Sequence, residues 1–326
     1  MSLIADTLQA HLPSKRKHTP SGWIGLNAPC CDDKRQRGGF IVNAGDAVSY
    51  HCFNCQFKCS WQPGRTISQK MSKFMRLLNM SDDMISQLRL EALRLNDNST
   101  TQIQSIIPKF EARALPIDSE PITEWTNKSS ALIGKLAPIL KYLSDRNLYL
   151  DDYPFYWTPK VGFSNRVIIP FYKDNVVVGY TARAVGDAKP KYLSEQQPGY
   201  VFNLDKQTDD REFVIVCEGP FDAISIDACA LLGAEIKDSQ HWLLKQLGRE
   251  IILVPDKDIA GAVTVEQALE FGWSVSMPDW PEGVKDVNDA VIKIGRLATL
   301  YLIISAKESN SLKIQLRAKK WFKDMT

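Results

Sequence analysis

The sequence of 326 residues contains no uninterrupted apolar run of about 20 residues, the length that a helix needs to cross a bilayer. Residues 1–6 contain neither the basic nor the apolar segment of a secretion signal. These absences predict a protein of the cytoplasm with no membrane partner. Because thiols stay reduced there, clustered cysteines indicate a metal site and not disulfides.

The net charge is also small, at +2, but the charged residues are unevenly distributed. Residues 1–76 hold eleven Lys and Arg against four Asp, and residues 306–326 hold six against two acidic residues. The residues between these two segments are therefore acidic overall. Basic ends suit contacts with a polyanion, and an acidic middle suits bound cations. By itself, the distribution equally fits ordinary solvated surface charge.

The chain length suits two or three domains. Residues 1–66 hold five of the seven cysteines and short alternating runs, which predict a small β module of the ribbon type. A helical pattern follows over 67–95, with Ser81 as a plausible N-cap. The stretch 96–130 is rich in Asn, Ser, Thr and Pro and is interpreted as a linker.

A mixed α/β pattern begins near residue 131. Residues 167–169 and 176–178 are expected to form strands on either side of a turn. The apolar runs 213–216 and 251–254 predict strands buried on both faces, as in a parallel sheet covered by helices. Near the end, a basic helix is expected with Leu312 and Leu316 on one side.

The cysteines near the N-terminus have the spacing of a structural zinc site. Cys52 and Cys55 form a Cys-x-x-Cys knuckle, and Cys30 and Cys31 lie about twenty residues upstream. Thiolates suit zinc, which accepts closed tetrahedral coordination without a redox role. We expect one zinc ion, held by these four cysteines.

The ligand set has alternatives, because two adjacent thiolates share a metal only through a tight turn. If one of the adjacent pair is a bystander, His18, His51 or Asp32 can complete the tetrahedron. Cys59 is a further candidate, although its position favours packing under Trp61.

Acidic residues follow the predicted buried strands at three places. Glu218 opens the sequence Glu-Gly-x-x-Asp, Asp256 and Asp258 lie in Asp-x-Asp-x-x-Gly, and Asp286 opens Asp-x-Asn-Asp, in which Asn288 is the third residue. A carboxylate after a strand lies at the carboxyl edge of a sheet, where open α/β folds bind ligands. Clustered carboxylates repel one another, and Mg²⁺ or Mn²⁺ relieves that repulsion while leaving positions open for phosphates.

A basic strip precedes the acidic region. It holds Arg166, Arg183, Lys189, Lys191 and Tyr192. Arg binds phosphate through two parallel hydrogen bonds, Lys acts as a point charge, and Tyr can stack on a base or sugar. The strip alone is equally consistent with an exposed basic hairpin.

Residues 50–55 resemble the zinc knuckle of bacterial and bacteriophage primases. Those families usually open the module with Cys-Pro-x-His or Cys-Pro-x-Cys, whereas this chain has Ala28 and Pro29 before Cys30. Cys30 is therefore the candidate replacement for the usual first ligand.

The three acidic motifs resemble, in order, those of the TOPRIM domain shared by primases, topoisomerases and related nucleases. The resemblance implies that Glu218 is a metal ligand or proton shuttle, that Asp256 and Asp258 are paired metal ligands, and that Asp286 is the third acidic position. Asn288 stands where many bacterial primases have Asp. T-even-type phage primases also have the sequence Asp-Val-Asn-Asp at this place.

The basic strip resembles the polymerase subdomain that precedes TOPRIM in primases, and its residues would line the nucleotide and template groove. The resemblance implies five segments: a zinc module (1–66), a helix and linker (67–130), the N-terminal part of a polymerase core (131–210), a TOPRIM domain (211–300) and a basic C-terminal helix (301–326). The fold class expected is α/β, α+β overall.

Together these observations lead us to expect a DNA primase that makes short RNA primers on single-stranded DNA from ribonucleoside triphosphates. The resemblance implies a phage origin, the bacterial host cytoplasm as location and a replicative helicase as partner. Five aromatic residues of the first module are candidates for stacking on template bases, of which one or two are expected to contact bases and the others to pack in the core of the module: Trp23, Phe40, Phe53, Phe57 and Trp61. The rival interpretations are a TOPRIM nuclease or topoisomerase, and a non-catalytic binding module.

Overall fold

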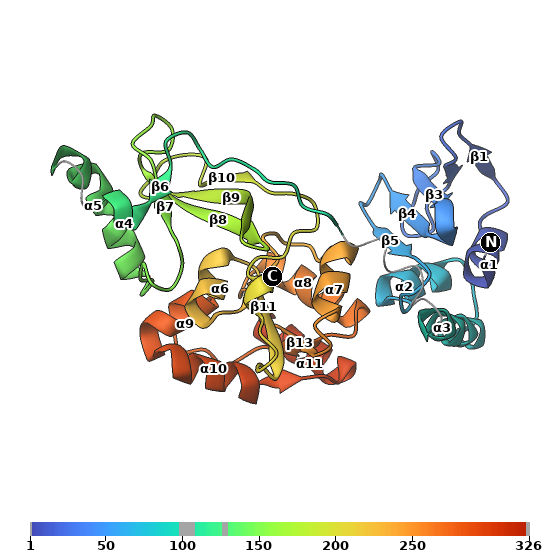
Figure 1. The fold of residues 1–326 in the computed structure, drawn as a ribbon. Helices are drawn as coiled ribbons and strands as arrows, with labels where there is room; N and C mark the ends of the chain where they lie inside the picture. The colour runs from blue at the N-terminus through green and yellow to red at the C-terminus, as the bar shows by residue number, and fades with distance from the viewer. Residues whose placement is uncertain (1, 98–107, 126–129, 324–326) are drawn as a thin grey trace. The chain divides into compact units, whose positions relative to one another are not determined.

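The computed structural model describes residues 2–97, 108–125 and 130–323 (Figure 1). Contacts between residues divide the chain into two compact units, residues 1–104 and 105–326. Each unit has a hydrophobic core of its own, and each is described by itself below. None of the described helices combines the length and apolar character needed to cross a membrane.

The first unit is built on a five-stranded antiparallel sheet in which the strands follow one another in sequence order. Alternate side chains of the sheet point into the core, where Phe40, Tyr50 and Trp61 are almost fully buried. This confirms the small β module expected from the short alternating runs within residues 1–66. The strands are β1 (Arg16–His18), β2 (Ile24–Leu26), β3 (Gly38–Val42), β4 (Val48–Cys52) and β5 (Lys58–Trp61), with the short 3-10 helix η1 (Ala44–Asp46) between β3 and β4.

Three helices complete the first unit: α1 (Leu3–Ala10), α2 (Gln69–Leu77) and α3 (Asp82–Asp97). The helical pattern expected over 67–95 is therefore two helices, separated by Asn79 with a positive φ of 58°. Ser81 caps α3 as expected, because its hydroxyl accepts the Met84 N–H at 3.2 Å. From α2, the Phe74 ring stacks on Tyr50 with ring centroids 4.1 Å apart, so the helix closes the core.

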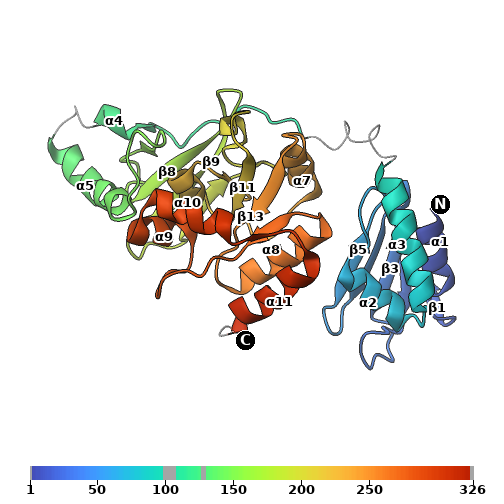
Figure 2. The same cartoon turned by 90° about the horizontal axis from the view of Figure 1, so that it is seen from below.

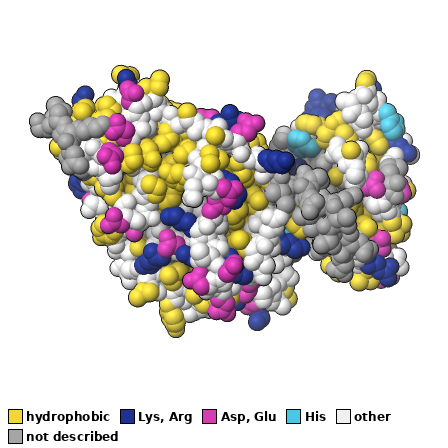
Figure 3. All heavy atoms as spheres, viewed as in Figure 1, with side chains coloured by type: hydrophobic (Ala, Val, Ile, Leu, Met, Phe, Trp, Pro, Cys, Tyr) yellow, Lys and Arg dark blue, Asp and Glu magenta, His cyan; other side chains and the backbone are white. Residues whose placement is uncertain are grey.

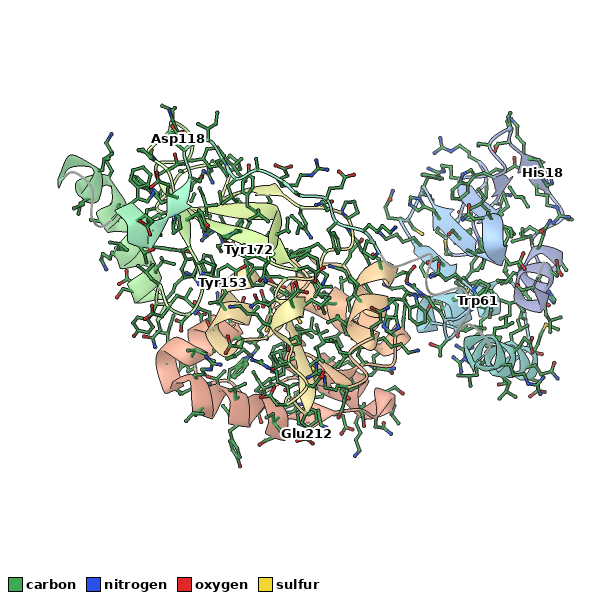
Figure 4. All side chains as sticks on the ribbon, viewed as in Figure 1. His18, Trp61, Asp118, Tyr153, Tyr172 and Glu212 are labelled. Carbon is green, nitrogen blue, oxygen red and sulfur yellow. The ribbon has the colours of Figure 1, made fainter. Side chains whose placement is uncertain are left out.

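The second unit contains an antiparallel sheet of order β10-β9-β8-β7-β6. Its two long central strands turn at Asp174 and Asn175, both with positive φ, which confirms the expected hairpin. Tyr153 and Tyr172, labelled in Figure 4, lie beside β8 with ring centroids 6.4 Å apart. The strands are β6 (Glu120–Pro121), β7 (Tyr156–Trp157), β8 (Arg166–Lys173), β9 (Val176–Ala184) and β10 (Tyr192–Glu195).

Residues 108–125 were expected to belong to a linker, and the structure places them differently. The Arg113 N–H donates to the Val177 carbonyl at 2.8 Å, and the Ile122 N–H donates to the Phe155 carbonyl at 2.8 Å. Trp125 is buried edge-on against Trp157. An Asn-, Ser- and Pro-rich composition does not prevent an extended segment from pairing with a sheet, because pairing uses the backbone. The other parts of the expected linker, 98–107 and 126–129, lie outside the described residues.

The parallel sheet of the second unit has the order β12-β11-β13-β14-β15. The first four strands in this order are parallel, and β15 pairs antiparallel with β14. The two apolar runs of the sequence form its central strands, as expected. The strands are β11 (Phe213–Cys217), β12 (Cys229–Ala230), β13 (Glu250–Leu253), β14 (Ser274–Ser276) and β15 (Lys307–Glu308).

Helices cover both faces of the parallel sheet (Figure 2). One face carries α6 (Pro220–Ile226), α9 (Val287–Ile294) and α10 (Arg296–Ser305), whose core extends to the antiparallel sheet. The other face carries α7 (Asp238–Lys245), α8 (Ile259–Glu270) and α11 (Ser311–Trp321). The remaining elements are α4 (Ile122–Trp125), α5 (Ser130–Asp145) and η4 (Leu204–Lys206).

The expected C-terminal helix is present as α11, but its buried face differs from the expected one. Ile314 and Trp321 are buried against the core that includes α8, whereas Leu312 and Leu316 are exposed. The helix is therefore part of the α/β layer, and its basic residues face outward from it.

Candidate functional site

The four cysteines Cys30, Cys31, Cys52 and Cys55 form one cluster. Within the described residues they are the one set of three or more His, Cys, Asp or Glu whose donor atoms all lie within 4.8 Å of one another. Four sulfurs around zinc with 2.3 Å bonds lie about 3.8 Å apart, so the set fits a tetrahedral thiolate centre.

The adjacent cysteines both contribute, because they face different partners. The Cys30 sulfur lies 3.4 Å from the Cys55 sulfur, and the Cys31 sulfur lies 3.6 Å from that of Cys52. Asp33, which the sequence analysis did not single out, forms the tight turn that this needs. Its carboxylate accepts the N–H groups of Ala28, Arg35 and Arg37 at 2.7–3.0 Å.

The electrostatics of the knuckle favour a thiolate at Cys52. Burial raises the pKa of Cys52, but the N–H groups of Cys55 and Asn54 outweigh this and bring the pKa down to about 7. The N–H groups lie 3.4 Å from the sulfur. Burial raises the pKa of Cys30, so of these two cysteines only Cys52 has a pKa that favours the thiolate form that zinc binds.

The alternative ligands lie outside this cluster. The His51 ring packs on Phe53, with ring centroids 4.3 Å apart, and its Nε2 atom lies 3.3 Å from the Gln56 side chain. His18 belongs to the exposed edge strand β1 (Figure 4), and Asp32 is likewise outside the set. Cys59 is buried in β5, two residues before Trp61.

In the second unit, the acidic residues gather at the carboxyl edge of the parallel sheet. Glu218 directly follows β11, and Asp256 follows β13, the neighbouring parallel strand. The Glu218 carboxylate accepts the Asp256 N–H and the Thr264 hydroxyl, each at 3.2 Å. Two loops that are 38 residues apart in sequence are thereby joined through one carboxylate.

Two of the acidic residues also cap helices. Asp258 accepts the Gly261 N–H at 2.9 Å at the start of α8, and Asp286 accepts the Asp289 N–H at 2.7 Å at the start of α9. A Cβ at Gly261 would lie 2.0 Å from the Asp256 carbonyl oxygen, so this position needs glycine. The glycine of the Asp-x-Asp-x-x-Gly motif thus allows the helix to approach the acidic loop closely.

Asp222 joins the group from α6, although the sequence analysis named it only as part of a motif. Its carboxylate is 7% exposed and accepts the Asn288 N–H at 2.9 Å. The Asn288 side chain in turn donates to the Arg146 carbonyl and the Ser225 hydroxyl, and its oxygen accepts from the Arg146 guanidinium at 2.7 Å. Asn288 is therefore a fully buried link between α5, α6 and α9.

The carboxylates are close enough to disturb one another's ionisation. Burial, together with the charges of Asp222, Glu218 and Asp286, raises the pKa of Asp256 to about 9. Burial and Asp286 likewise raise the pKa of Asp222 to about 7. The acidic side chains of the three loops are therefore neighbours, although among the described residues no three of their carboxylate oxygens all lie within 4.8 Å of one another.

Arg183 and Tyr192 of the basic strip reach this acidic group. The Arg183 guanidinium lies 4.8 Å above the Tyr192 ring, and its Nε donates to the Tyr142 hydroxyl at 3.0 Å. Burial raises the pKa of Tyr192, while the charges of Arg183 and Arg146 lower it and that of Asp222 raises it, so these groups are neighbours. Basic and acidic side chains lie side by side over α6 in Figure 3.

Arg146 is a residue that the sequence analysis missed. Its guanidinium lies 5.1 Å above the Tyr142 ring and 5.2 Å above the Phe221 ring. Its charge also lowers the pKa of Asp222. No local pattern marks this residue, since apart from Tyr142 the contacts named here come from α6 and α9, which are far away in sequence.

Arg166 does not face phosphate or template as expected. Its side chain is buried, and it donates to the carbonyls of Gly162, Ala182 and Pro190 at 2.8–3.3 Å. These three acceptors come from separate segments, so Arg166 holds the antiparallel sheet together. Lys189 and Lys191, in the same loop as Pro190, are exposed.

One comparison with known proteins matches the segment of the chain that holds the acidic group. Residues 215–291 match the Toprim-like family model. This segment holds every acidic residue of the second unit described above, from Glu218 to Asp289.

The chain is also similar to curated DNA primases. It is 28% identical over 163 residues to the DNA primase of Clostridium acetobutylicum, which covers 44% of this chain and 27% of that protein. It is 32% identical over 156 residues to the DNA primase of Rickettsia bellii, which covers 41% of this chain and 26% of that protein. The chain thus matches about a quarter of the length of these curated relatives.

Two solved structures of primases show a weaker likeness. The DnaG primase catalytic domain bound to ssDNA superposes with a TM-score of 0.47 and 18% identity, covering 57% of this chain and 76% of that one. The primase fragment of the bacteriophage T7 primase-helicase superposes with a TM-score of 0.37 and 11% identity, covering 85% of this chain and 98% of that one.

The raised pKa values in the Toprim-like segment predict a pH-dependent stability. Because Asp256 and Asp222 bind protons more tightly in the folded protein than in the unfolded chain, stability without divalent metal falls as the pH rises from about 4 to about 9. Asp256→Asn removes one of these carboxyls. We expect the melting temperature of the second unit to fall between pH 5 and pH 9 by on the order of 5 °C more in the wild type than in this variant.

Scanning calorimetry of zinc-loaded protein in buffer free of Mg²⁺ measures this difference. Adding excess Mg²⁺ should reduce the pH dependence of the wild type. Identical pH profiles for the two proteins would mean that the carboxylates do not repel one another as the structure indicates.

Proposed function

We propose that this protein is a DNA primase that joins ribonucleoside triphosphates into short primers on single-stranded DNA. The observation that carries the proposal is the convergence of Glu218, Asp256 and Asp286 at one sheet edge, beside Arg183 and Tyr192. Carboxylates and guanidinium groups on facing elements suit a reaction in which a metal-bound phosphate moves between two oxygens.

The acidic residues supply oxygen ligands for a hard cation. Glu218, Asp256, Asp258 and Asp286 would hold Mg²⁺ or Mn²⁺, which prefer carboxylate oxygens. Such ions, when bound, activate the attacking hydroxyl and neutralise the departing pyrophosphate. Asp258 and Asp286 each use one oxygen to cap a helix, and the Asp286 carboxyl also hydrogen-bonds the Asp222 carboxyl, so a cation bound here would take the place of that contact.

The basic side chains would orient the substrates. Arg183 lies against Tyr192 with one buried nitrogen, Nη1, that has no hydrogen-bond partner, so the guanidinium retains a donor for a phosphate oxygen. Exposed Lys189 and Lys191 would add positive charge for the template backbone. Arg166 is not included, because its donors face backbone carbonyls.

The first unit would bind one zinc ion through Cys30, Cys31, Cys52 and Cys55. The role is structural, since four thiolates leave no open position for a substrate. The zinc would join the loop between β2 and β3 to the end of β4 and the loop that follows it.

The outer face of the first unit's sheet suits a single strand of nucleic acid. Lys17, Gly25, Gly39, His51 and Lys58 are paired neighbours on successive strands, so they form one row across all five strands. Residues directly opposite one another point to the same face of a sheet. The row therefore has a lysine at each end. At Gly25 and Gly39, between those ends, no side chain covers the sheet.

The rings of Trp23 and Phe53 lie beside Gly39 of this row. A Cβ at Gly39 would lie 3.0 Å from a ring carbon of Trp23 and 3.6 Å from one of Phe53. Phe53 is 59% exposed, and the His51 ring packs on it. Exposed rings beside lysines are what stacking on template bases needs. Phe40 and Trp61, also expected as stacking candidates, are buried in the core instead.

The Asp-Val-Asn-Asp sequence at 286–289 supports placing the chain beside the T-even-type phage primases. With that placement, we propose a replicative helicase as a partner and a bacterial host cytoplasm as the location. Asn288 is buried and forms hydrogen bonds with Asp222 and Ser225 of α6 and with Arg146, the residue that follows α5. These bonds indicate a structural role for Asn288. An asparagine at a position where related proteins have an acidic residue therefore leaves the other carboxylates in place.

Primer synthesis with labelled ribonucleotides on single-stranded DNA tests the proposal. A primase yields short, template-dependent RNA products with Mg²⁺ or Mn²⁺ present. Degradation of the template would support the rival Toprim-like nuclease, and DNA binding without any product would support a non-catalytic module.

A further inference from the structure

One lysine stands inside the acidic motif and yet lies away from its carboxylates. Lys257 separates Asp256 from Asp258, and its Nζ lies 5.7 Å from the centroid of the Trp321 ring. Among the described residues, no ion pair within 4.0 Å links Lys257 to a carboxylate. The positive group nearest in sequence to the acidic pair therefore rests on an aromatic face.

Trp321 is held firmly where it meets Lys257. It is the last residue of α11, its side chain is 8% exposed, and its ring packs edge-on against Phe322 with centroids 5.0 Å apart. The indole Nε1 donates to the Pro278 carbonyl at 3.0 Å. Helix α11 packs beside α8, the helix that Asp258 caps (Figure 2). Lys257 thus belongs to the acidic loop itself, and Trp321 belongs to a helix that packs on the helix capped by that loop.

The ammonium group of Lys257 has two alternative positions. A flexible ammonium can approach a cluster of carboxylates and neutralise part of their repulsion, or it can lie over an indole face, the most favourable of the aromatic faces for a cation. In the first position it would compete with a divalent cation for the same oxygens. The backbone N–H of Lys257 donates to the Lys285 carbonyl at 2.9 Å, so this choice concerns the side chain alone.

We propose that Trp321 is a positioning residue that keeps the Lys257 ammonium out of the carboxylate cluster and so keeps the cluster open to a divalent cation. The proposal rests on the carboxylates being the divalent site of the proposed function. It does not require that the protein make primers.

Direct Mn²⁺ binding to the full, zinc-loaded chain tests this without an activity assay. Free Mn²⁺ is measured by electron paramagnetic resonance at neutral pH, and Asp256→Asn defines the binding that belongs to the cluster. We expect Trp321→Met, which removes the aromatic face, to raise the Mn²⁺ Kd about threefold to tenfold. Adding Lys257→Met to that variant should restore the wild-type Kd to within about twofold.

Phe322→Leu is the matched control, because it reduces a neighbouring buried ring of the same helix that makes no recorded contact with Lys257. It should lower the melting temperature but leave the Mn²⁺ Kd within about twofold of the wild type. A loss of Mn²⁺ binding in Trp321→Met that persists in the double variant would overturn the proposal, since the effect would then come from packing or from the Pro278 bond.

Lys257→Met alone gives a test that does not depend on how Trp321 variants fold. If the ammonium already lies away from the cluster, its removal changes the Mn²⁺ Kd by less than about twofold. A tightening of fivefold or more would show that the ammonium competes in the wild type, and the proposal would be wrong. If wild-type protein binds Mn²⁺ at the cluster but makes no primers, the proposed function fails while this inference stands.

Discussion

Replacing Asp256 by asparagine is expected to reduce primer synthesis about a thousandfold. Asparagine keeps the shape of the side chain but removes the charge at the centre of the carboxylate cluster, where Asp222, Glu218 and Asp286 all act on this residue. Loss of a charged ligand from a catalytic divalent site costs several kcal/mol, and ~4 kcal/mol corresponds to about a thousandfold in rate. The measurement is the initial rate of ribonucleotide incorporation on single-stranded DNA at saturating Mg²⁺.

Asp279→Asn serves as the control, because the Asp279 side chain is 97% exposed and forms a long ion pair with Arg317, at 4.0 Å. It should retain the wild-type rate within about twofold. The Asp256 variant should also fold at least as well as the wild type, since it removes repulsion. If Asp256→Asn retained more than about a tenth of the wild-type rate, the carboxylates would not be the metal site of the reaction.

The position of the acidic group was predictable because its signals are local. An apolar run followed by an acidic residue and a glycine predicts a strand that ends at a carboxylate, and parallel strands end at the same edge. Glu218 and Asp256 needed no knowledge of distant contacts to be placed together. The presence of a cysteine cluster was predictable for a similar reason, since spacing brings a knuckle and its upstream pair together, but spacing left His18, His51, Asp32 and Cys59 as alternative ligands.

The roles of Arg166 and Arg146 could not be predicted from local sequence patterns. The sequence places Arg166 at the start of a strand beside other basic residues, but its three carbonyl acceptors come from two loops and strand β9, which no sequence pattern joins. Arg146 reaches Asn288, which is 142 residues away, through a contact that only the packing of α5 on α9 creates. Contacts between distant segments decide whether a guanidinium is buried as a structural link or faces a site.

Removing the zinc is expected to unfold the first unit and leave the second folded. The sheet of the first unit is short, and the loop that carries Cys30 and Cys31 is joined to β4 through the sulfur cluster. Structural zinc contributes about 10 kcal/mol or more to the folding of small modules, which exceeds the stability of most domains of this size. Cys52→Ser should therefore abolish the cooperative unfolding transition of the first unit.

Cys59→Ala is the matched variant, because Cys59 is buried in the same sheet but lies outside the cluster. It should bind one zinc per chain by mass spectrometry and keep its amide signals in NMR spectra, while Cys52→Ser should lose both the metal and the dispersed signals of the first unit. Signals from the second unit should be unchanged in either variant, since that unit has a separate core. A first unit that stayed folded in Cys52→Ser would mean that its hydrophobic core, around Tyr50 and Phe74, is sufficient without the metal, and the cysteines would then need another explanation.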